Sequence, residues 1–345
     1  HNLSESINGC LALLENPEID IEGLMHYIKA PDFPTGGIIY GYSGVKDAFM
    51  TGRGRIVVRA KAEIVTEDDR EKIIVSEIPY NVNKRVLIED IARLVEEKRL
   101  DGISNINDES DRKGMRIVID IKKDANANVV LNKLFKMTQL QSSFSVNNVA
   151  LVKGRPQTLN LKEILQHFLD HRHDVVIRRT KFELKKAQDR AHIVEGLIIA
   201  SDNIDEVIHI IKTSKTTDEA RERLSERFNL DEVQTRAIVE MRLRNLTNLE
   251  QDKLHDEYAE LMKLIQHLND ILTDEAVCRK VIEEELIDVR DKFGDERKTV
   301  IEYTAGEFNA EDFYADDEMI ITISHLGYIK RTALSEFRAQ NRGGV

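Results

Sequence analysis

The sequence predicts an α+β protein in which a mixed α/β domain precedes a long antiparallel helical hairpin and the first strands of an all-β domain. All five prolines lie before residue 157, and between Arg155 and Phe293 the 345-residue chain has a single proline, Pro156, and a single glycine, Gly196. A stretch of this length without helix breakers favours continuous helix. The preceding part is punctuated by proline and glycine and alternates between strand and helix patterns, which indicates a mixed domain.

Composition excludes several classes of protein. The chain carries 50 Lys+Arg and 62 Asp+Glu, a net charge of −12, and its 41% hydrophobic content excludes wholesale disorder. No uncharged apolar stretch reaches the ~18 residues that a membrane-spanning helix needs. Cys10 and Cys278 lie far apart, which excludes a disulfide framework and a Cys-rich zinc site. We therefore expect a cytoplasmic protein and, because the chain opens at His1 without a signal peptide or an initiator Met, an excised fragment.

The first half of the chain has the pattern of a compact ββαββα unit. Residues 1–35 are expected to form two short helices and a connector, and residues 36–155 the mixed domain. Alternating β-branched residues predict a β-hairpin, and apolar residues spaced by three and four predict a helix after it. The expected elements are helices Asn2–Asn16 and Asp20–Tyr27, the hairpin of Arg55–Val65 with Lys72–Ile78, helix Asn83–Lys98, strands Gly102–Asn107 and Met115–Ile121, and helix Asn126–Met137.

Two helical stretches, 156–202 and 249–293, are predicted to pair as the arms of an antiparallel coiled coil. Their apolar residues alternate between spacings of three and four, as a and d positions do. These residues are Leu184, Ala187, Ala191, Val194 and Ile198 in the outgoing arm, and Leu254, Tyr258, Leu261, Ile265, Leu268 and Leu272 in the returning arm. Three capping-box spacings, beginning at Thr216, Asp231 and Thr247, predict a helical knob over 203–248. In 294–345, Met319–Ser324 and Tyr328–Thr332 predict a β-hairpin that follows a linker and begins an all-β domain.

A basic strip is the clearest candidate for ligand binding. The stretch Val45–Lys61 carries Lys46, Arg53, Arg55, Arg59 and Lys61 against Asp47 alone. Glycines beside Arg53 and Arg55 allow close backbone approach, and arginine binds phosphate bidentately. The odd positions Arg55, Arg59 and Lys61 predict one shared strand face. The strip therefore predicts phosphate binding, with the solvated outer face of a sheet as the alternative.

Three other patterns in the sequence are weaker signals of a binding site. Lys84 opens a helix that Asn83 can cap, so its free N–H groups predict either a phosphate contact or an ordinary cap. The helix over 231–247 is more apolar than a small knob requires, which predicts a two-fold subunit interface or internal packing of the knob. The apolar residues concerned are Val233, Ile238, Met241, Leu243 and Leu246. The spacings of the histidines and carboxylates predict no metal site, and no motif supports self-contained catalysis.

Segments along essentially the whole chain resemble the A subunit of bacterial type IIA DNA topoisomerases. In the first half these are His1-Asn2-Leu3, Pro31-Asp32-Phe33-Pro34-Thr35, Thr51-Gly52-Arg53-Gly54-Arg55, Glu77-Ile78-Pro79-Tyr80-x-Val82-Asn83-Lys84, Asp108-Glu109-Ser110-Asp111 and Gly114-Met115-Arg116-Ile117-Val118. Further along they are Thr138-Gln139-Leu140-Gln141, Arg178-Arg179-Thr180, Asp189-Arg190-Ala191-His192 and Arg242-Leu243-x-x-Leu246-Thr247. Ser324-His325-Leu326-Gly327-Tyr328 resembles the start of the DNA-wrapping domain in the supercoiling branch of this family. The stretch Gln340, Asn341, Arg342, Gly343 and Gly344 resembles its glycine-rich box, with Asn341 where a basic residue is usual.

The resemblance implies an ATP-dependent type II topoisomerase that introduces negative supercoils by double-strand passage. It implies no cofactor in this chain, ATP and Mg on a partner B subunit in an A2B2 assembly, double-stranded DNA as substrate, and a homodimer that meets at the knob as an exit gate. Residues 1–35 would end the DNA gate, 36–155 would form the tower, and Lys46, Arg53, Arg55, Arg59, Lys61 and Lys84 would grip DNA. The branch specialised in unlinking DNA, and a coiled-coil scaffold that binds no DNA, stay open as alternatives.

The family's catalytic tyrosine follows an arginine on a winged-helix domain that would lie before His1. Tyr27, Tyr40, Tyr42, Tyr80, Tyr258, Tyr303, Tyr314 and Tyr328 do not lie in the family's Arg-Tyr-Thr context. The resemblance therefore implies that this chain holds no catalytic residue and does not cleave DNA by itself.

Overall fold

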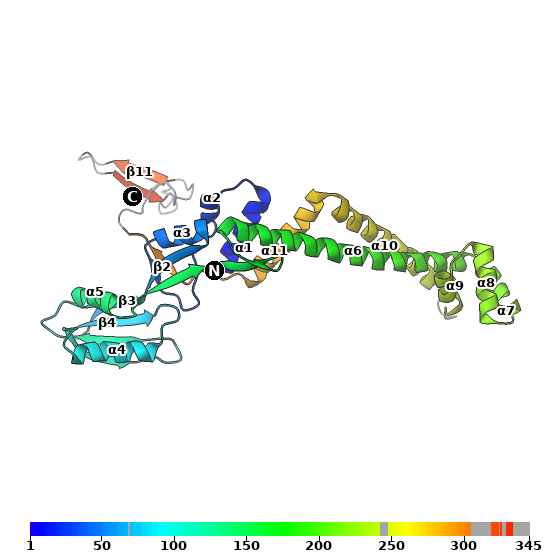
Figure 1. Ribbon diagram of the computed structural model, residues 1–345. Helices are drawn as coiled ribbons and strands as arrows, with labels where there is room; N and C mark the ends of the chain where they lie inside the picture. Colours follow the sequence, from blue (N-terminus) through cyan, green and yellow to red (C-terminus); the bar gives the residue numbers. More distant parts are fainter. Residues whose placement is uncertain (68–69, 242–247, 305–318, 324, 326–328, 334–345) are drawn as a thin grey trace, which may run out of the picture. The chain divides into compact units, whose positions relative to one another are not determined.

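The computed structural model describes residues 1–67, 70–241, 248–304, 319–323, 325 and 329–333, shown as ribbons in Figure 1. The chain divides into two compact units. The sheet unit comprises His1–Glu5, Asp20–Lys162 and Asp295–Val345, and the helical unit comprises Ser6–Ile19 and Glu163–Gly294.

The first sheet of the sheet unit has the strand order β10-β1-β2-β7. Its strands are β10 (Val300–Glu302), β1 (Ile38–Tyr40), β2 (Arg53–Arg59) and β7 (Gln141–Asn147). The pair β1–β10 is parallel and the other pairs are antiparallel. Two helices, α2 (Ile21–Met25) and α3 (Ser43–Thr51), precede β2. A strand from residues 300–302 thus completes a sheet built mainly from the first half of the chain.

The second sheet confirms the predicted ββαββα order. Its strands β3 (Lys61–Glu67), β4 (Arg70–Glu77), β6 (Ile117–Ile121) and β5 (Ile103–Asp108) are antiparallel throughout, in that order. Helices α4 (Lys84–Glu96) and α5 (Ala127–Met137) share one core with these strands. Leu87, Ile91 and Leu134 from the helices are fully buried with Ile73 and Ile119 from the strands. Asn83 and Asn126 cap the two helices by accepting backbone N–H bonds.

The prediction of one strand over Arg55–Val65 is wrong, because the chain changes sheets at Ala60. The backbone N–H of Ala60 donates to Leu140 O at 2.7 Å, and the residue is fully buried. Lys61 consequently begins β3 in the second sheet, where it pairs with Glu77, while Arg55 and Arg59 lie on β2 in the first. The three cations therefore do not share one strand face.

A two-stranded antiparallel ribbon, separate from the two sheets above, was not predicted from the sequence. Strands β8 (Val149–Val152) and β9 (Arg155–Thr158) pair antiparallel with Leu151 opposite Pro156. Lys153 and Gly154 both have positive φ, 50° and 79°, as the two central residues of a type I′ hairpin turn do. Each strand is only four residues long, and Pro156 argues against a strand in a pattern-based reading.

The helical unit contains α1 (Leu3–Glu15), whose greater part belongs to it, and two long helical stretches joined by shorter helices. The outgoing stretch is α6 (Leu161–Asp202), and the returning stretch is α10 (Asn248–Thr273) followed by α11 (Glu275–Phe293). Between them lie α7 (Ile204–Thr213), α8 (Thr217–Phe228) and α9 (Glu232–Val239). Thr216 and Asp231 cap α8 and α9 as predicted, and Asp231 with Gln234 forms a complete capping box. Thr247 lies outside the described residues.

Ion pairs join the outgoing and returning stretches in antiparallel order. Arg190 on α6 makes two hydrogen bonds to the Glu257 carboxylate on α10, at 2.6 and 3.0 Å. Nearer the start of α6, Arg172 and Arg179 both reach Glu285 on α11. Of the predicted a and d residues, Ala187, Ala191, Val194 and Leu268 are buried and the others are half-buried. The returning stretch is interrupted at Asp274, which caps α11.

Near the C-terminus, β11 (Met319–Ile323) and β12 (Ile329–Ala333) form the predicted antiparallel hairpin. Residues 334–345, which include the predicted glycine-rich box, lie outside the described residues. Among the helices that the structure describes, none is both long and apolar enough to cross a membrane.

Candidate nucleic-acid interface

Strands β2 and β7 present one polar face, here called the β2–β7 face: Arg53, Arg55, Ser143, Ser145 and Asn147. Arg53 lies opposite Asn147 and Arg55 opposite Ser145 in the antiparallel register. Directly opposite residues project to the same side of a sheet, so these side chains form one surface. All five are exposed. The face therefore offers two guanidinium groups, two hydroxyls and an amide, all of which can donate hydrogen bonds to phosphate oxygens.

Within the part of the chain that the structure describes, no carboxylate pairs with the two arginines of the β2–β7 face. Among the described residues, neither Arg53 nor Arg55 forms an ion pair. The 38-residue stretch Ala125–Lys162, which supplies β7, contains no Asp or Glu, although 62 of the 345 residues are acidic. An exposed cationic surface without competing carboxylates is suited to binding the nucleic-acid backbone.

Helix α3 fixes the backbone of this face from the opposite side. A Cβ on Gly54 would lie 2.3 Å from Gly44 O, and a Cβ on Gly44 would lie 2.0 Å from Arg55 O. Both positions therefore need glycine so that α3 can approach β2. Gly52, at φ 77°, ends α3, and the Thr51 hydroxyl accepts a bond from Arg53 N at 3.2 Å. The Thr51-Gly52-Arg53-Gly54-Arg55 sequence is thus a helix end followed directly by a strand.

Arg59 has a different environment from Arg53 and Arg55. Its guanidinium carbon lies 3.2 Å from the centre of the Tyr40 ring and 4.7 Å from that of Phe135. Its Nε donates to Gln141 Oε1 at 2.7 Å, and the side chain is half-buried. These contacts join β1, β7 and α5, so the Arg59 guanidinium already has partners within the protein. The phosphate contact at Arg59 stays a prediction.

The three lysines predicted to bind phosphate are dispersed. Lys46 Nζ lies 2.8 Å from Glu22, and Lys84 Nζ lies 2.7 Å from Asp108. The hydrogen bond from Lys84, assisted by bonds from Ser110, lowers the pKa of Asp108 to about 2, so this carboxylate is ionised at neutral pH. Lys61 lies on the second sheet. Of the six predicted cations, the structure brings together only Arg53 and Arg55 on one exposed surface.

Sequence reasoning missed Ser143, Ser145 and Asn147, because polar residues in a strand are an unspecific signal. A usable signal was nevertheless present. The absence of carboxylates from Ala125 to Lys162 marks the segment that pairs with the two arginines. Only the β2–β7 register shows which residues of that segment lie beside them.

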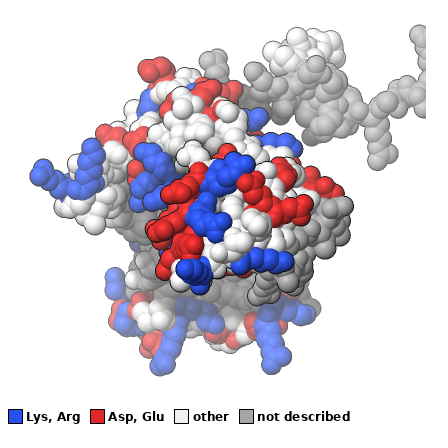
Figure 2. Space-filling model, turned by 90° about the vertical axis from the view of Figure 1, so that its right-hand side faces the viewer, with Lys and Arg blue, Asp and Glu red and all other residues white. Residues whose placement is uncertain are grey.

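The residues predicted to form the subunit contact of the knob differ in their exposure to solvent. Val233 on α9 is 53% exposed, and Met241 is half-buried. Ile238 is 2% exposed and packs with Val207 and Leu224 inside the knob, which favours the internal-packing alternative for that residue. Leu243 and Leu246 lie outside the described residues. Figure 2 views the knob of α7–α9 end-on and shows acidic and basic side chains interspersed over it.

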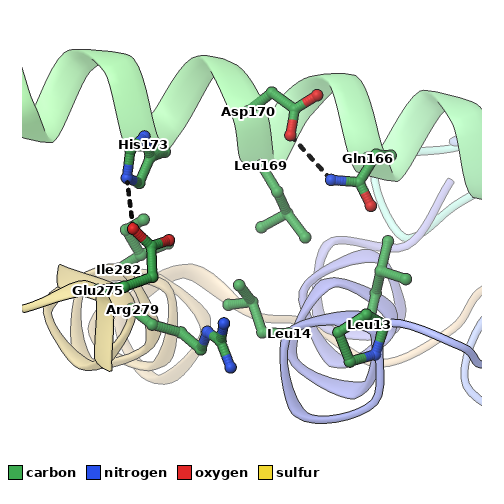
Figure 3. Close-up of a pocket in the computed structure, with 10 residues that line it drawn as sticks. Leu13, Leu14, Gln166, Leu169, Asp170, His173, Glu275, Arg279 and Ile282 are labelled. Atoms are coloured by element: carbon green, nitrogen blue, oxygen red, sulfur yellow. Dashed lines mark hydrogen bonds and ion pairs between the residues drawn. The ribbon is translucent and has the colours of Figure 1, made fainter. Parts of the chain in front are cut away.

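A pocket of about 430 Å³ lies between α1, α6 and α11, close to the helix break at Asp274 (Figure 3). Leu13, Leu169 and Ile282 supply apolar walls. His173 Nε2 lies 3.5 Å from a Glu275 oxygen, a pair that is ionic only when the imidazole is protonated. Gln166 donates to Asp170 on the same helix at 2.8 Å. These contacts explain the pocket as a gap beside a helix break, with polar side chains that bond to each other.

No group of three or more His, Cys, Asp or Glu side chains within the described ranges is arranged to hold a metal ion. The two cysteines are buried, and burial raises the pKa of the Cys10 thiol to about 11. Tyr42 is buried, and its hydroxyl donates to Lys29 O. These groups are therefore poorly placed to act as nucleophiles.

The geometry defines a protein with an exposed cationic sheet face and a long helical arm, and sequence comparison gives its family. The chain belongs to the family of DNA gyrase and topoisomerase IV A subunits, whose profile matches residues 1–287. A second profile, the β-propeller C-terminal domain of DNA gyrase, matches residues 318–345. Both matches confirm the resemblance drawn from the sequence motifs.

Similar proteins include the A subunits of DNA gyrase from three bacteria. That of Clostridium acetobutylicum is 53% identical over 345 residues, which cover all of this chain and 42% of the relative. That of Halalkalibacterium halodurans is 53% identical over 344 residues, covering all of this chain and 41% of the relative. That of Staphylococcus aureus strain MRSA252 is 52% identical over 347 residues, covering all of this chain and 39% of the relative. The chain thus spans about two fifths of the length of these curated relatives.

Proposed function

We propose that this chain is the part of a gyrase-type A subunit that holds DNA beside the cleavage site and carries the exit gate. The parent protein would use ATP, hydrolysed with Mg on a B subunit in an A2B2 assembly, to introduce negative supercoils by double-strand passage. Similarity to the A subunits of gyrase along the whole chain supports this proposal. The match of residues 318–345 to the gyrase C-terminal domain favours gyrase over topoisomerase IV, which is the alternative.

The β2–β7 face is the observation that supports DNA holding. Its two arginines are exposed, lie two residues apart on one strand, and have polar neighbours across the register. Arginine and hydroxyl contacts to phosphate position a duplex without reading its sequence, as a strand-passing enzyme requires. Arg59 contributes by fixing β2 against Tyr40.

The test is duplex binding by the chain and by an Arg53→Ala/Arg55→Ala variant over a range of salt concentrations. Each phosphate contact adds about 0.9 to the slope of log K against log salt concentration, so the variant should lose almost two. Its affinity should fall on the order of tenfold or more. Arg112→Ala/Lys113→Ala removes two exposed charges near Asp108, Glu109 and Asp111 and serves as the control. Equal affinity and slope for the arginine variant and the unchanged chain would show that this face does not hold DNA.

We further propose that α6, α10 and α11 form a coiled-coil arm whose knob meets a second copy of the chain. The 42 residues of α6 span about 60 Å, enough to enclose a duplex between two arms. The exposed Val233 and the apolar residues after Val239 would supply the contact. Sedimentation of the chain and of Val233→Glu tests this gate, and a chain that stays monomeric at high concentration contradicts it.

Strand cleavage is proposed to reside outside the residues of this chain, since none of its tyrosines lies in the family's Arg-Tyr-Thr context. Incubation with a B subunit, Mg and supercoiled DNA should yield no cleaved complex. Supercoiling of a relaxed circle by the parent protein, given ATP together with its B subunit, would support gyrase. Relaxation or unlinking without supercoiling would support topoisomerase IV. No DNA binding at all would support the scaffold alternative.

A further inference from the structure

The β8–β9 ribbon continues directly from the β2–β7 face. Residue Asn148 joins β7 to β8, and its backbone N–H donates to Gly52 O at 2.8 Å. Its carbonyl accepts a bond from Leu159 N at 2.9 Å, so both strands of the ribbon are tied at the base beside Arg53. The ribbon therefore leaves the first sheet at a fixed place next to the proposed DNA surface.

The ribbon exposes apolar side chains that nothing in the described part of the chain covers. Leu151 is 74% exposed and Val149 is 51% exposed. The register places Pro156 opposite Leu151 and Thr158 opposite Val149, so one side of the ribbon is largely apolar. An isolated two-stranded hairpin is marginal in water, and such a surface indicates an occupant.

The charge of the ribbon indicates the chemistry of that occupant. Lys153 and Arg155 are exposed at its tip and form no ion pair within the described residues. The ribbon lies within the carboxylate-free stretch Ala125–Lys162 of an otherwise acidic chain. A polyanion therefore meets only attractive charge along β7, β8 and β9.

We propose that the β8–β9 ribbon enters a groove of the duplex held on the β2–β7 face. Lys153 and Arg155 contact phosphates on the groove rim, and Leu151 with Pro156 packs against the apolar wall of the groove. A two-stranded ribbon is of a width that the major groove admits. This inference rests on the proposed function, because the ribbon continues the surface to which that function assigns the duplex.

The test compares duplex affinity and salt slope for variants of the whole chain. In Lys153→Ala/Arg155→Ala the slope of log K against log salt concentration should fall by almost two, as expected for Arg53→Ala/Arg55→Ala. The affinity for the duplex should fall roughly tenfold at ~0.1 M salt. Arg112→Ala/Lys113→Ala, which removes the same charge from another hairpin turn, should change neither. Leu151→Ser should lower affinity several-fold at an unchanged slope, because it removes an apolar contact and no charge. Hydroxyl-radical footprints should shorten at one end in both ribbon variants.

The outcomes separate the two proposals. Loss of binding in Arg53→Ala/Arg55→Ala with no change in either ribbon variant would overturn the ribbon inference and leave the β2–β7 face as the DNA surface. It would then assign the apolar side of the ribbon to a protein partner. No change in any variant would overturn both. Circular dichroism checks that each variant is folded, and Lys153→Gln/Arg155→Gln replaces the alanine pair if that variant is not.

Discussion

Arginines of the β2–β7 face and arginines of the helical unit have opposite surroundings. Among the described residues of the helical unit, most arginines form ion pairs with carboxylates: Arg172, Arg178, Arg179, Arg190, Arg221, Arg227, Arg236 and Arg290. Arg53 and Arg55 form none among the described residues. Because the residue type is the same in both regions, the presence of nearby carboxylates decides whether an arginine forms an ion pair or stays available to an anionic ligand.

The difference follows from the two secondary structures. On helices α6, α10 and α11, residues three or four apart and residues facing across the arms bring acids and bases together. On a sheet, the neighbours of a cation are the residues across the register, and for β2 these come from a segment without acids. The first arrangement stabilises the arm, and the second leaves charge available to a polyanion.

The largest effect is expected from a substitution that distorts the backbone beneath the β2–β7 face. Gly54→Ala places a methyl group 2.3 Å from Gly44 O and should cost about 3 kcal/mol of stability, because α3 must move away from β2. DNA binding should fall with it. Denaturant unfolding measures the first effect and duplex titration the second. Gly114→Ala, with no atom within 4 Å but φ at 151°, is the control and should cost about 1 kcal/mol of backbone strain.

A smaller effect tests the structural role of the paired arginines. Glu285→Gln removes the carboxylate that Arg172 and Arg179 share and should destabilise the helical unit by about 1 kcal/mol, since the three side chains are partly exposed. Duplex affinity should not fall. Glu284→Gln, whose neighbour Lys280 is 3.9 Å away, should leave stability unchanged. Equal free energies of unfolding for the two variants would contradict the division between arginines held in ion pairs and arginines available to DNA.

Lowering the pH should destabilise the knob, because Asp231 becomes protonated. Its pKa is lowered by the backbone bond from Gln234 and then by the hydrogen bond that its carboxylate makes with His192 Nε2. Because the folded pKa is the lower one, the stabilisation is complete above the unfolded pKa of about 4 and is lost as pH falls through the folded pKa. Hydrogen exchange of α9 amides should accelerate over that window. Asp231→Asn should flatten the pH dependence, and an unchanged profile in this variant would assign it to other groups.

The smallest expected effect converts a paired cation into an available one. Asp108→Asn releases Lys84 from its ion pair, so the salt slope of DNA binding should rise by no more than about one and affinity by about twofold. Filter binding at several salt concentrations measures both. An increase would extend the DNA surface to α4. A decrease would mean that the ion pair itself organises the interface, and that pairing with a carboxylate does not withdraw a cation from DNA.

Several elements followed from local sequence alone. The ββαββα order and the N-caps Asn83, Thr216 and Asp231 depend on periodicity and short-range hydrogen bonding. The change of sheet at Ala60 did not follow, because strand periodicity continues through it and the decisive bond comes from Leu140, 80 residues away. Ribbon β8–β9 was missed because its strands are short and contain Pro156.

The amino-acid sequence by itself determined the classes of element, the long helical arm, the basic strip and the family to which the chain belongs. Local propensity and motif spacing carry that information without long-range contacts. Only the tertiary structure decided which cations are available: it stacked Arg59 on Tyr40, paired Lys84 with Asp108, and set Arg53 and Arg55 beside Ser145 and Asn147. The physical reason is that the availability of a charge depends on its neighbours in space, and strand register and helix packing choose those neighbours.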